Sequence, residues 1–165
     1  MSRDARLLTS ALLVSAWGGA ALLTVAVVTP GAFAVLPTRT MAGTMVGAVL
    51  PALFLSGIAV AAIVAVLSGR VTESRPAALT AALAGAACAV SQFGINPRIA
   101  RLRVEIGGPV DALAADDNRR VAFGLLHGYS IGGLAVAMLA LAISLGFLVA
   151  ALHRRSHVSV SVPLT

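Results

Sequence analysis

Residues 121–152 read VAFGLLHGYSIGGLAVAMLALAISLGFLVAAL and contain no Asp, Glu, Lys or Arg. An α-helix rises about 1.5 Å per residue, so about 20 apolar residues cross the roughly 30 Å of hydrocarbon in a bilayer. The stretch therefore predicts a membrane-spanning helix. Three further charge-free runs are long enough to do the same, at residues 7–28, 41–68 and 77–97. None of the four alternates strictly between apolar and polar residues, which favours helices over the strands of a membrane barrel.

The composition of the whole chain supports the same fold class. Of its 165 residues, 59% are hydrophobic and 11% are charged, and the mean hydropathy is +0.98. Soluble domains average about 45–50% apolar and about 25% charged residues, so a soluble domain, a disordered chain and a disulfide scaffold are excluded. We predict an all-α integral membrane protein, a bundle of four transmembrane helices in a single domain (residues 1–165), with a polar C-terminal tail at residues 153–165.

The first apolar run has an alternative interpretation as a signal peptide. Residues 1–6 carry two arginines, and Ala32-Phe33-Ala34 fits the small residues of a cleavage site. The apolar core of a signal peptide is only about 7–15 residues long, and residues 7–28 exceed that length. We therefore interpret this run as the first span. Cleavage would leave three spans.

All twelve basic residues are arginines, against six acidic residues, and the formal net charge is +6. The arginines lie at the ends of the apolar runs, where they would contact lipid headgroups. The lipid bilayer is therefore an expected partner, and nucleic acid is not. A four-span topology places six arginines on each side of the membrane, so the positive-inside rule gives no orientation. We expect a plasma or inner membrane location with both termini in the cytoplasm.

The segment between the third and fourth spans predicts a long helical hairpin that protrudes from the bilayer. Ile99, Leu102 and Ile106 recur at helical spacing among arginines, so the third helix should continue to about Ile106. Residues 107–109, Gly-Gly-Pro, should then break it, because glycine favours a helix C-terminus and proline a helix start. The fourth helix should accordingly begin near Pro109.

A turn at residues 107–108 fixes the expected pairing of the two arms. If both arms rise equally, the numbers of residues at the same height sum to about 215. Arg98 then lies level with Asp117 and can form a salt bridge with it. Deeper in the bundle, Cys88 lies level with His127.

His127 is the only histidine or charged side chain in the four runs. Ionisable groups are costly in lipid and are functional candidates by default. The alternative is a hydrogen bond to a neighbouring helix that stabilises the bundle, and we favour this role. Either role requires His127 to face the bundle interior, near Ser91 or Gln92. The candidate intramembrane polar site consists of His127, Ser130, Ser91, Gln92 and Asn96.

A soft-metal site is a further hypothesis. The thioethers, thiol and imidazole of Met41, Met45, Cys88 and His127 suit Cu(I) or another soft ion. No C-x-x-C motif supports the site, and methionine commonly fills gaps in an apolar core. We therefore favour packing for these side chains. The single cysteine cannot form an internal disulfide.

Glycines recur every four residues in two of the spans, at Gly43 and Gly47 and at Gly124, Gly128 and Gly132. Small residues at this spacing let helices approach closely. We expect both sets to be helix-packing residues inside the bundle rather than a dimer seam.

Short motifs occur in a characteristic order: Trp17-Gly18; Pro30, Phe33, Leu36 and Pro37; Ala42-Gly43-x3-Gly47-x3-Pro51-x2-Phe54; Asn96-Pro97-Arg98-Ile99-x2-Leu102-Arg103; and Phe123-x2-Leu126-His127-x2-Ser130. In this order and spacing, over residues 7–152, the chain resembles the transmembrane-protein-205-like family of small four-helix membrane proteins. The resemblance implies an integral membrane bundle that handles a small solute or a soft metal. The family pattern has an asparagine where this chain has Leu134, so any polar role of that asparagine is absent.

Familiar enzyme signatures are absent from the sequence: it contains no P-loop, no H-E-x-x-H and no G-x-S-x-G. We therefore expect no enzymatic activity and no cofactor. The first functional hypothesis is a small-solute or soft-metal binding or transport module. The alternative is a non-catalytic accessory or scaffold subunit that packs against a larger membrane complex or against copies of itself. A polar cavity that reaches His127 would favour the first, and a sealed bundle the second.

Overall fold

The computed structural model describes the backbone of residues 1–160 and their side chains, except those of Glu73 and residues 155–160. Of the predicted polar tail, residues 153–160 continue the last helix, and residues 161–165 lie outside the described residues. The elements in chain order are α1 (Arg3–Leu23), η1 (Thr24–Val28), α2 (Thr29–Val35), α3 (Arg39–Gly69), η2 (Thr72–Ser74), α4 (Arg75–Ala89), η3 (Val90–Ile95), α5 (Asn96–Ile106), η4 (Val110–Ala112) and α6 (Asn118–Val160).

The predicted fold class is confirmed, because most of the described residues are helical and none of them forms a strand. The continuous helical stretches Arg3–Val35, Arg39–Gly69, Arg75–Ile106 and Asn118–Arg154 are long and apolar enough to cross a membrane. Side-chain caps mark two of their starts: the Ser2 hydroxyl accepts a hydrogen bond from the Ala5 N–H, and the Thr38 hydroxyl accepts one from the Met41 N–H, both at 3.2 Å. Such caps satisfy N–H groups that have no partner within the helix.

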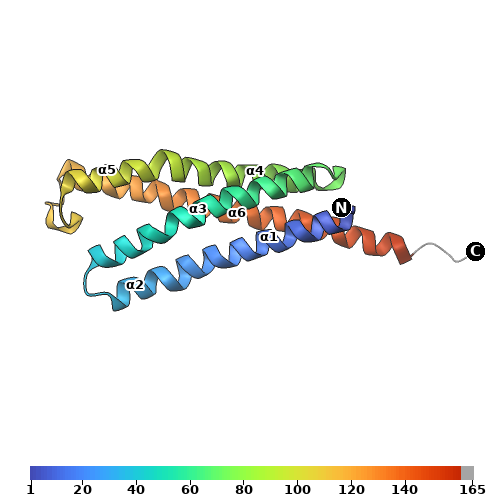
Figure 1. Cartoon of the computed structure of the whole chain (residues 1–165), viewed down its shortest axis with the longest axis horizontal. Helices are drawn as coiled ribbons and strands as arrows, with labels where there is room; N and C mark the ends of the chain where they lie inside the picture. The colour runs from blue at the N-terminus through green and yellow to red at the C-terminus, as the bar shows by residue number, and fades with distance from the viewer. Residues whose placement is uncertain (161–165) are drawn as a thin grey trace, which may run out of the picture.

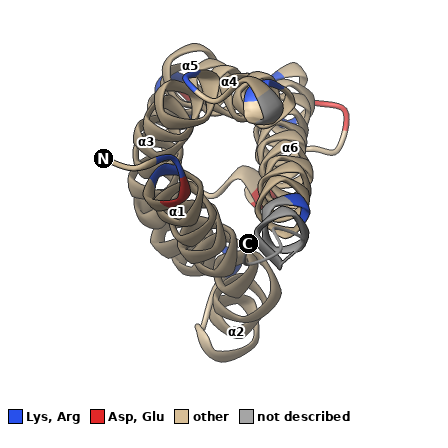
Figure 2. Ribbon diagram, turned by 90° about the vertical axis from the view of Figure 1, so that its right-hand side faces the viewer, with Lys and Arg blue, Asp and Glu red and all other residues tan. Residues whose placement is uncertain are grey.

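The helices form a bundle in which α1 packs against α3 and α6, and α4 packs against the same two helices (Figures 1 and 2). The main apolar core lies between them and includes Trp17, Phe54 and Leu141. The buried positions of α4 are small, with Ala81 and Ala84 fully buried. Small side chains bring the helix axes close together, which is how helices gain packing energy in a membrane.

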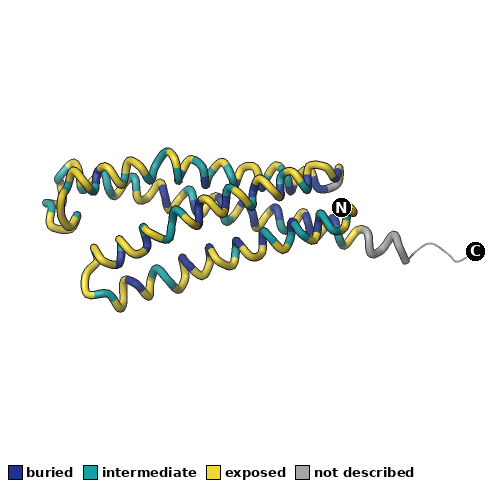
Figure 3. Tube along the Cα trace, viewed as in Figure 1, coloured by how far each residue is buried: buried dark blue, intermediate teal, exposed yellow. Residues whose placement is uncertain are grey.

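The chain forms two helical hairpins, the first running from α1 to α3 and the second from α4 to α6. The two hairpins diverge at one end of the bundle, which is therefore open. In Figure 1, α2 and the start of α3 lean away from α5 and the start of α6. A small separate core of Ala32, Ala42 and Val46 joins α2 to α3 and includes no residue of α5 or α6. Most residues at the diverging ends are exposed (Figure 3). Contacts between the two hairpins at this end therefore depend on long side chains.

The two hairpins repeat one pattern of burial. Each buried residue between positions 7 and 24 has a buried counterpart 67 positions later. The backbone repeats as well: η1 and η3 are both π-helical, and each is followed by a helix whose second residue is proline, Pro30 or Pro97. Single π-helical turns often occur at functional sites. The matched pairs are Leu7 and Ser74, Ser10 and Ala77, Val14 and Ala81, Trp17 and Ala84, Ala21 and Cys88, and Thr24 and Ser91.

The hairpin between α5 and α6 matches its prediction at one end only. Helix α5 ends at Ile106, and Gly107 follows with φ +66°, a conformation that glycine adopts without strain. The fourth helix was predicted to begin near Pro109, and this is wrong: only one short 3-10 turn follows the proline, and α6 begins at Asn118.

The late start of α6 has a local cause. The carboxylate of Asp117 accepts a hydrogen bond from the Arg119 N–H at 2.8 Å, which caps the helix. Arg120 donates to the Leu113 carbonyl at 2.7 Å and holds the preceding segment against the helix start. The Arg119 side chain also donates to Asp117, and together these hydrogen bonds lower the pKa of Asp117 to about 2. Asp117 thus pairs with Arg119 at 2.8 Å, and the predicted salt bridge with Arg98 is wrong.

Because α6 begins later than predicted, the register between the third and fourth spans differs from the predicted one. Ser130 of α6 contacts Asn96, and Gly133 lies against Ser91. These pairs have numbers that sum to about 225, so the arms are displaced by nearly three helical turns from the prediction. Cys88 therefore does not lie level with His127.

Candidate functional site

Arg103 is the residue that connects the two hairpins at their diverging ends. Its side chain is half-buried and extends from α5, and its Nη2 donates a hydrogen bond of 3.4 Å to the Gly43 carbonyl of α3. Its guanidinium carbon lies 5.5 Å from the ring centroid of Phe123 on α6. A cation over an aromatic face at this distance is attracted by the ring. One side chain thus contacts both α3 and α6.

Gly43 and Gly47 provide the surface on which the guanidinium lies. A Cβ at Gly47 would lie 3.3 Å from Nη1 of Arg103, and one at Gly43 would lie 3.8 Å from Nη2. The sequence predicted this pair as a close contact between helices. The nearest atoms belong to the side chain of Arg103 on α5 instead.

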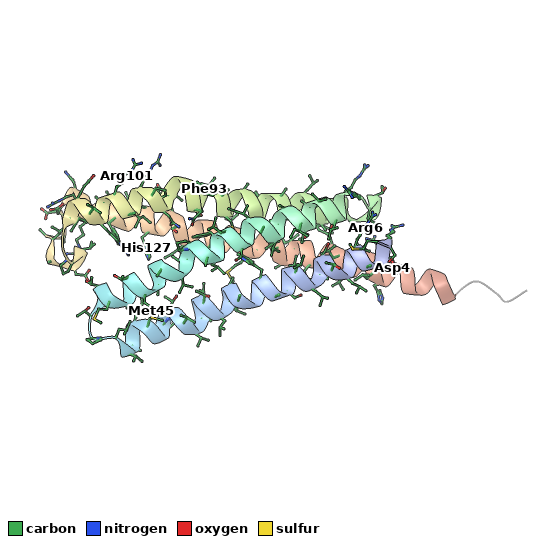
Figure 4. All side chains as sticks on the ribbon, viewed as in Figure 1. Asp4, Arg6, Met45, Phe93, Arg101 and His127 are labelled. Atoms are coloured by element: carbon green, nitrogen blue, oxygen red, sulfur yellow. The ribbon has the colours of Figure 1, made fainter. Side chains whose placement is uncertain are left out.

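His127 lies beside this contact rather than in the bundle interior. Its ring stacks on Phe123 with the centroids 6.1 Å apart and the planes 8° from parallel. The residue is exposed, and Figure 4 places it where the hairpins diverge. The prediction that it faces inward near Ser91 or Gln92 is wrong, because the register shift moves it towards the open end. We call Gly43, Gly47, Arg103, Phe123 and His127 the Arg103 cluster.

Three of the other predicted polar residues meet in a short chain of hydrogen bonds. Asn96 Nδ2 donates to Gln92 Oε1 at 3.1 Å, and Ser130 Oγ donates to Asn96 Oδ1 at 3.4 Å. On α6 this chain lies about one helical turn from the Arg103 cluster, because Ser130 follows His127 by three residues, and on the third span Asn96 precedes Arg103 by about two turns. The chain joins the third span to α6.

Ser91 plays a different part from its polar neighbours. It is fully buried in η3. Its hydroxyl occupies the space that the Cβ of a larger residue at position 133 would need. The hydroxyl has no hydrogen-bond partner among the described residues. Ser91 and Gly133 therefore form a close contact between the third span and α6 that the glycine spacing did not predict.

The four soft donors do not converge. Cys88 is fully buried against Trp17 and Gly57, and a Cβ at Gly57 would lie 2.8 Å from its sulfur. Met41 and Met45 are exposed on α3, and Figure 4 shows Met45 beside the α2–α3 hairpin. His127 lies on α6 in the Arg103 cluster. Among the residues whose side chains the structure describes, no group of three or more His, Cys, Asp and Glu could hold a metal ion.

The glycines at positions 124, 128 and 132 of α6 face outward. All three are exposed, and a Cβ at any of them would meet no atom within 4 Å. Their predicted role in packing the bundle is therefore wrong. The glycines at which an added Cβ would meet a neighbour at 3.0 Å or less are Gly57, Gly85 and Gly133, none of which stands in a four-residue repeat with another of the three.

Comparison with known proteins identifies the family of the chain. A family described as a domain of unknown function, DUF4149, matches residues 12–107, which include α3, both π-helical segments and Arg103. Neither the curated proteins nor the solved structures give a match. Because the family covers more than half of the chain, this four-helix membrane protein belongs to the DUF4149 family.

Proposed function

We propose that the protein is a non-catalytic membrane module that binds a small organic anion at the Arg103 cluster. The observation that carries the proposal is the guanidinium of Arg103, held half-buried between α3 and α6. A guanidinium has five N–H donors. Among the described residues its hydrogen-bond acceptor is the Gly43 carbonyl, which leaves donors for a ligand.

The chemistry of the cluster favours an anion with an apolar or aromatic part. Arginine binds carboxylates through two parallel hydrogen bonds. The stacked rings of Phe123 and His127 extend beside it and offer a flat apolar surface. Charged groups within membrane domains commonly mark solute pathways. The proposed kinship with the transmembrane-protein-205-like family, carried by motifs such as Phe123-x2-Leu126-His127, is consistent with solute handling.

Benzoate is a suitable probe because it carries a carboxylate on a ring. We expect benzoate to raise the unfolding temperature of the purified protein in detergent, and uncharged benzamide to have no effect. Arg103→Gln should weaken benzoate binding by about 10–100-fold, the loss of one charge-assisted hydrogen-bond pair. Arg101→Gln is the matched control, since Arg101 is exposed on the same helix and points away from the bundle (Figure 4).

Two results would overturn the proposal: no benzoate effect on the wild type at millimolar concentration, or an equal effect on Arg103→Gln and wild type. If binding is found, uptake of labelled benzoate by proteoliposomes distinguishes a transporter from a binding module. We further propose an inner or plasma membrane location with cytoplasmic termini, which reporter fusions to each terminus would test.

An assembly subunit is the second candidate, and the outward glycines of α6 favour it. Gly124, Gly128 and Gly132 leave a shallow strip that a partner helix could approach closely. A larger complex, or a homo-oligomer, would then survive purification from native membranes in mild detergent. Gly128→Leu should disrupt it without affecting benzoate binding.

A further inference from the structure

The internal repeat extends beyond the first helix of each hairpin. Every buried residue of α3 from Val46 to Ser68 has a buried counterpart 83 or 84 positions later on α6. This offset exceeds the 67 positions that relate α1 to α4, because the connection between α5 and α6 is longer than the one between α2 and α3. The two hairpins are therefore like repeats. The matched pairs are Val46 and Ser130, Leu53 and Ala137, Phe54 and Ala137, Gly57 and Ala140, Ala61 and Ser144, Val64 and Leu148, and Ser68 and Ala151.

The repeat assigns a counterpart to the contact that Arg103 makes with α3. Leu36 precedes Arg103 by 67 positions and occupies the equivalent place, directly after α2. The residue equivalent to Gly43 is Leu126 or His127, which lie 83 and 84 positions later on α6. When two like repeats are related by an axis along the membrane normal, a contact from the second to the first has a counterpart in the reverse direction. The repeat thus predicts that Leu36 lies against α6 at His127.

This counterpart contact is not made in the structure. α2 contacts η1 and α3, and among the described residues no comparable contact joins it to α6. Leu36 packs on the small separate core that joins α2 to α3, but it is only partly buried. Val35 is 82% exposed, and His127 is exposed as well. Figure 2 shows α2 outside the ring that the long helices form, so the two faces that should meet are both uncovered.

The helix before α2 is weakened at the place where a movement of α2 needs a hinge. η1 is π-helical, and Pro30 follows it as the second residue of α2. Proline has no N–H and cannot donate the hydrogen bond of an ordinary helical residue. The Thr24 hydroxyl donates to the Ala20 carbonyl at 2.8 Å, a hydrogen bond of a kind that often bends helices. α2 is thus joined to α1 through a bendable segment, whereas α1 is fixed in the main core.

A bound anion gives α2 a reason to move. Covering the Arg103 cluster without an anion would remove a charged guanidinium from water, which is costly. An anion on Arg103 neutralises that charge, so the pair can be covered. Val35 and Leu36 lie close to Arg39 in the sequence, at the membrane edge where water is present. Closure therefore also removes apolar surface from water, and the ligand favours the closed arrangement because it binds that arrangement better.

We propose that α2 is a lid that closes on α6 at His127 when the Arg103 cluster binds its anion. The proposal rests on the proposed function, because the bound anion drives the closure. In the closed arrangement Leu36 contacts α6 as Arg103 contacts α3. Leu36 then forms a wall of the site and favours anions that carry an apolar part.

The test measures distances between pairs of spin labels on the full chain in lipid nanodiscs, in a Cys88→Ala background. Gly31→Cys with Gly128→Cys labels α2 and α6, and Gly19→Cys with Gly128→Cys is the matched control because Gly19 precedes the hinge. All three glycines are exposed, and a Cβ at any of them would meet no atom within 4 Å. Millimolar benzoate should shorten the distance between positions 31 and 128 until the two helix axes are about 8–10 Å apart, the spacing of packed helices. The control distance should stay unchanged, and in Arg103→Gln neither distance should change.

A second variant tests the wall that Leu36 provides. Leu36→Ala should weaken benzoate binding about fivefold, because closure buries roughly half of a leucine side chain in addition to the part already covered. Leu22→Ala is the matched control, since Leu22 is exposed on α1 before the hinge and should bind benzoate as the wild type does. Far-ultraviolet circular dichroism establishes that each variant is folded.

The outcomes separate the lid from the anion site itself. If benzoate raises the unfolding temperature but leaves the distance between positions 31 and 128 unchanged, the lid is overturned and the proposed function stands. Equal shortening of both label pairs would overturn the lid as well, because the whole first hairpin would then move. The same holds if Arg103→Gln keeps the full benzoate-dependent shortening. If benzoate changes neither the unfolding temperature nor any distance, both the lid and the proposed function fail.

Discussion

Replacing Trp17 by alanine should lower the free energy of unfolding by about 3–5 kcal/mol, the range for removing a large buried aromatic side chain. Trp17 is only 4% exposed and belongs to the main core. Its Nε1 also donates a hydrogen bond of 3.0 Å to the Leu53 carbonyl, which ties α1 to α3. Unfolding by heat or by denaturing detergent, followed by far-ultraviolet circular dichroism, measures the loss.

Trp17→Phe separates packing from hydrogen bonding. Phenylalanine keeps most of the apolar volume but loses the Nε1–H donor, and a net hydrogen bond contributes about 0.5–1.5 kcal/mol. We therefore expect the phenylalanine variant to be far less destabilised than the alanine variant. Equal destabilisation would mean that the volume of Trp17 does not support the bundle and that our account of the core is mistaken.

Gly57→Ala should destabilise the protein by about 1–3 kcal/mol, although alanine is the better helix former. The added methyl group would lie 2.8 Å from the sulfur of Cys88 and 2.9 Å from Cζ2 of Trp17, so at least one neighbour must move. Overpacking of this kind costs about 1–3 kcal/mol and outweighs the gain in helix propensity of up to about 1 kcal/mol. Thermal unfolding in detergent measures the net effect.

Gly146→Ala is the control for Gly57→Ala, since a Cβ at Gly146 meets nothing within 4 Å and the propensity gain acts alone. The double variant Gly57→Ala, Cys88→Ala should recover part of the loss, because it removes the sulfur that the methyl group meets. The overpacking explanation fails if Gly57→Ala is as stable as Gly146→Ala.

The four spans and the end of α5 could be predicted because they depend on local properties of the sequence. Charge-free length indicates a membrane helix, and the Gly-Gly-Pro sequence at 107–109 indicates a helix end. The start of α6 was missed because proline and a capping aspartate compete as start signals. Asp117 is a good N-cap residue, and its hydrogen bond to the Arg119 N–H determines the outcome.

The Arg103 cluster could not be predicted in the same way, because it depends on the register and separation of two hairpins. Helical spacing placed Arg103 among the arginines outside the membrane. Nothing in the sequence indicated that its long side chain extends to the Gly43 carbonyl on α3. Gly43 and Gly47 were predicted to leave space for a close neighbour, but such a space accommodates a helix or a long side chain equally well. The error at His127 followed directly from the misplaced helix start.

The position of Arg103 depends on the number of residues in the π-helical segment η3, which precedes α5. A π turn accommodates one residue more than the regular ladder allows, and one residue corresponds to about 100° of rotation around a helix. Loss of a single residue between Val90 and Ile95 would restore an ordinary helix and rotate α5 by about that angle. Arg103 would then point away from α3 although its own neighbours were unchanged. A substitution in η3 thus alters the contacts of one side chain. A deletion in η3 instead rotates every residue of the helix that follows.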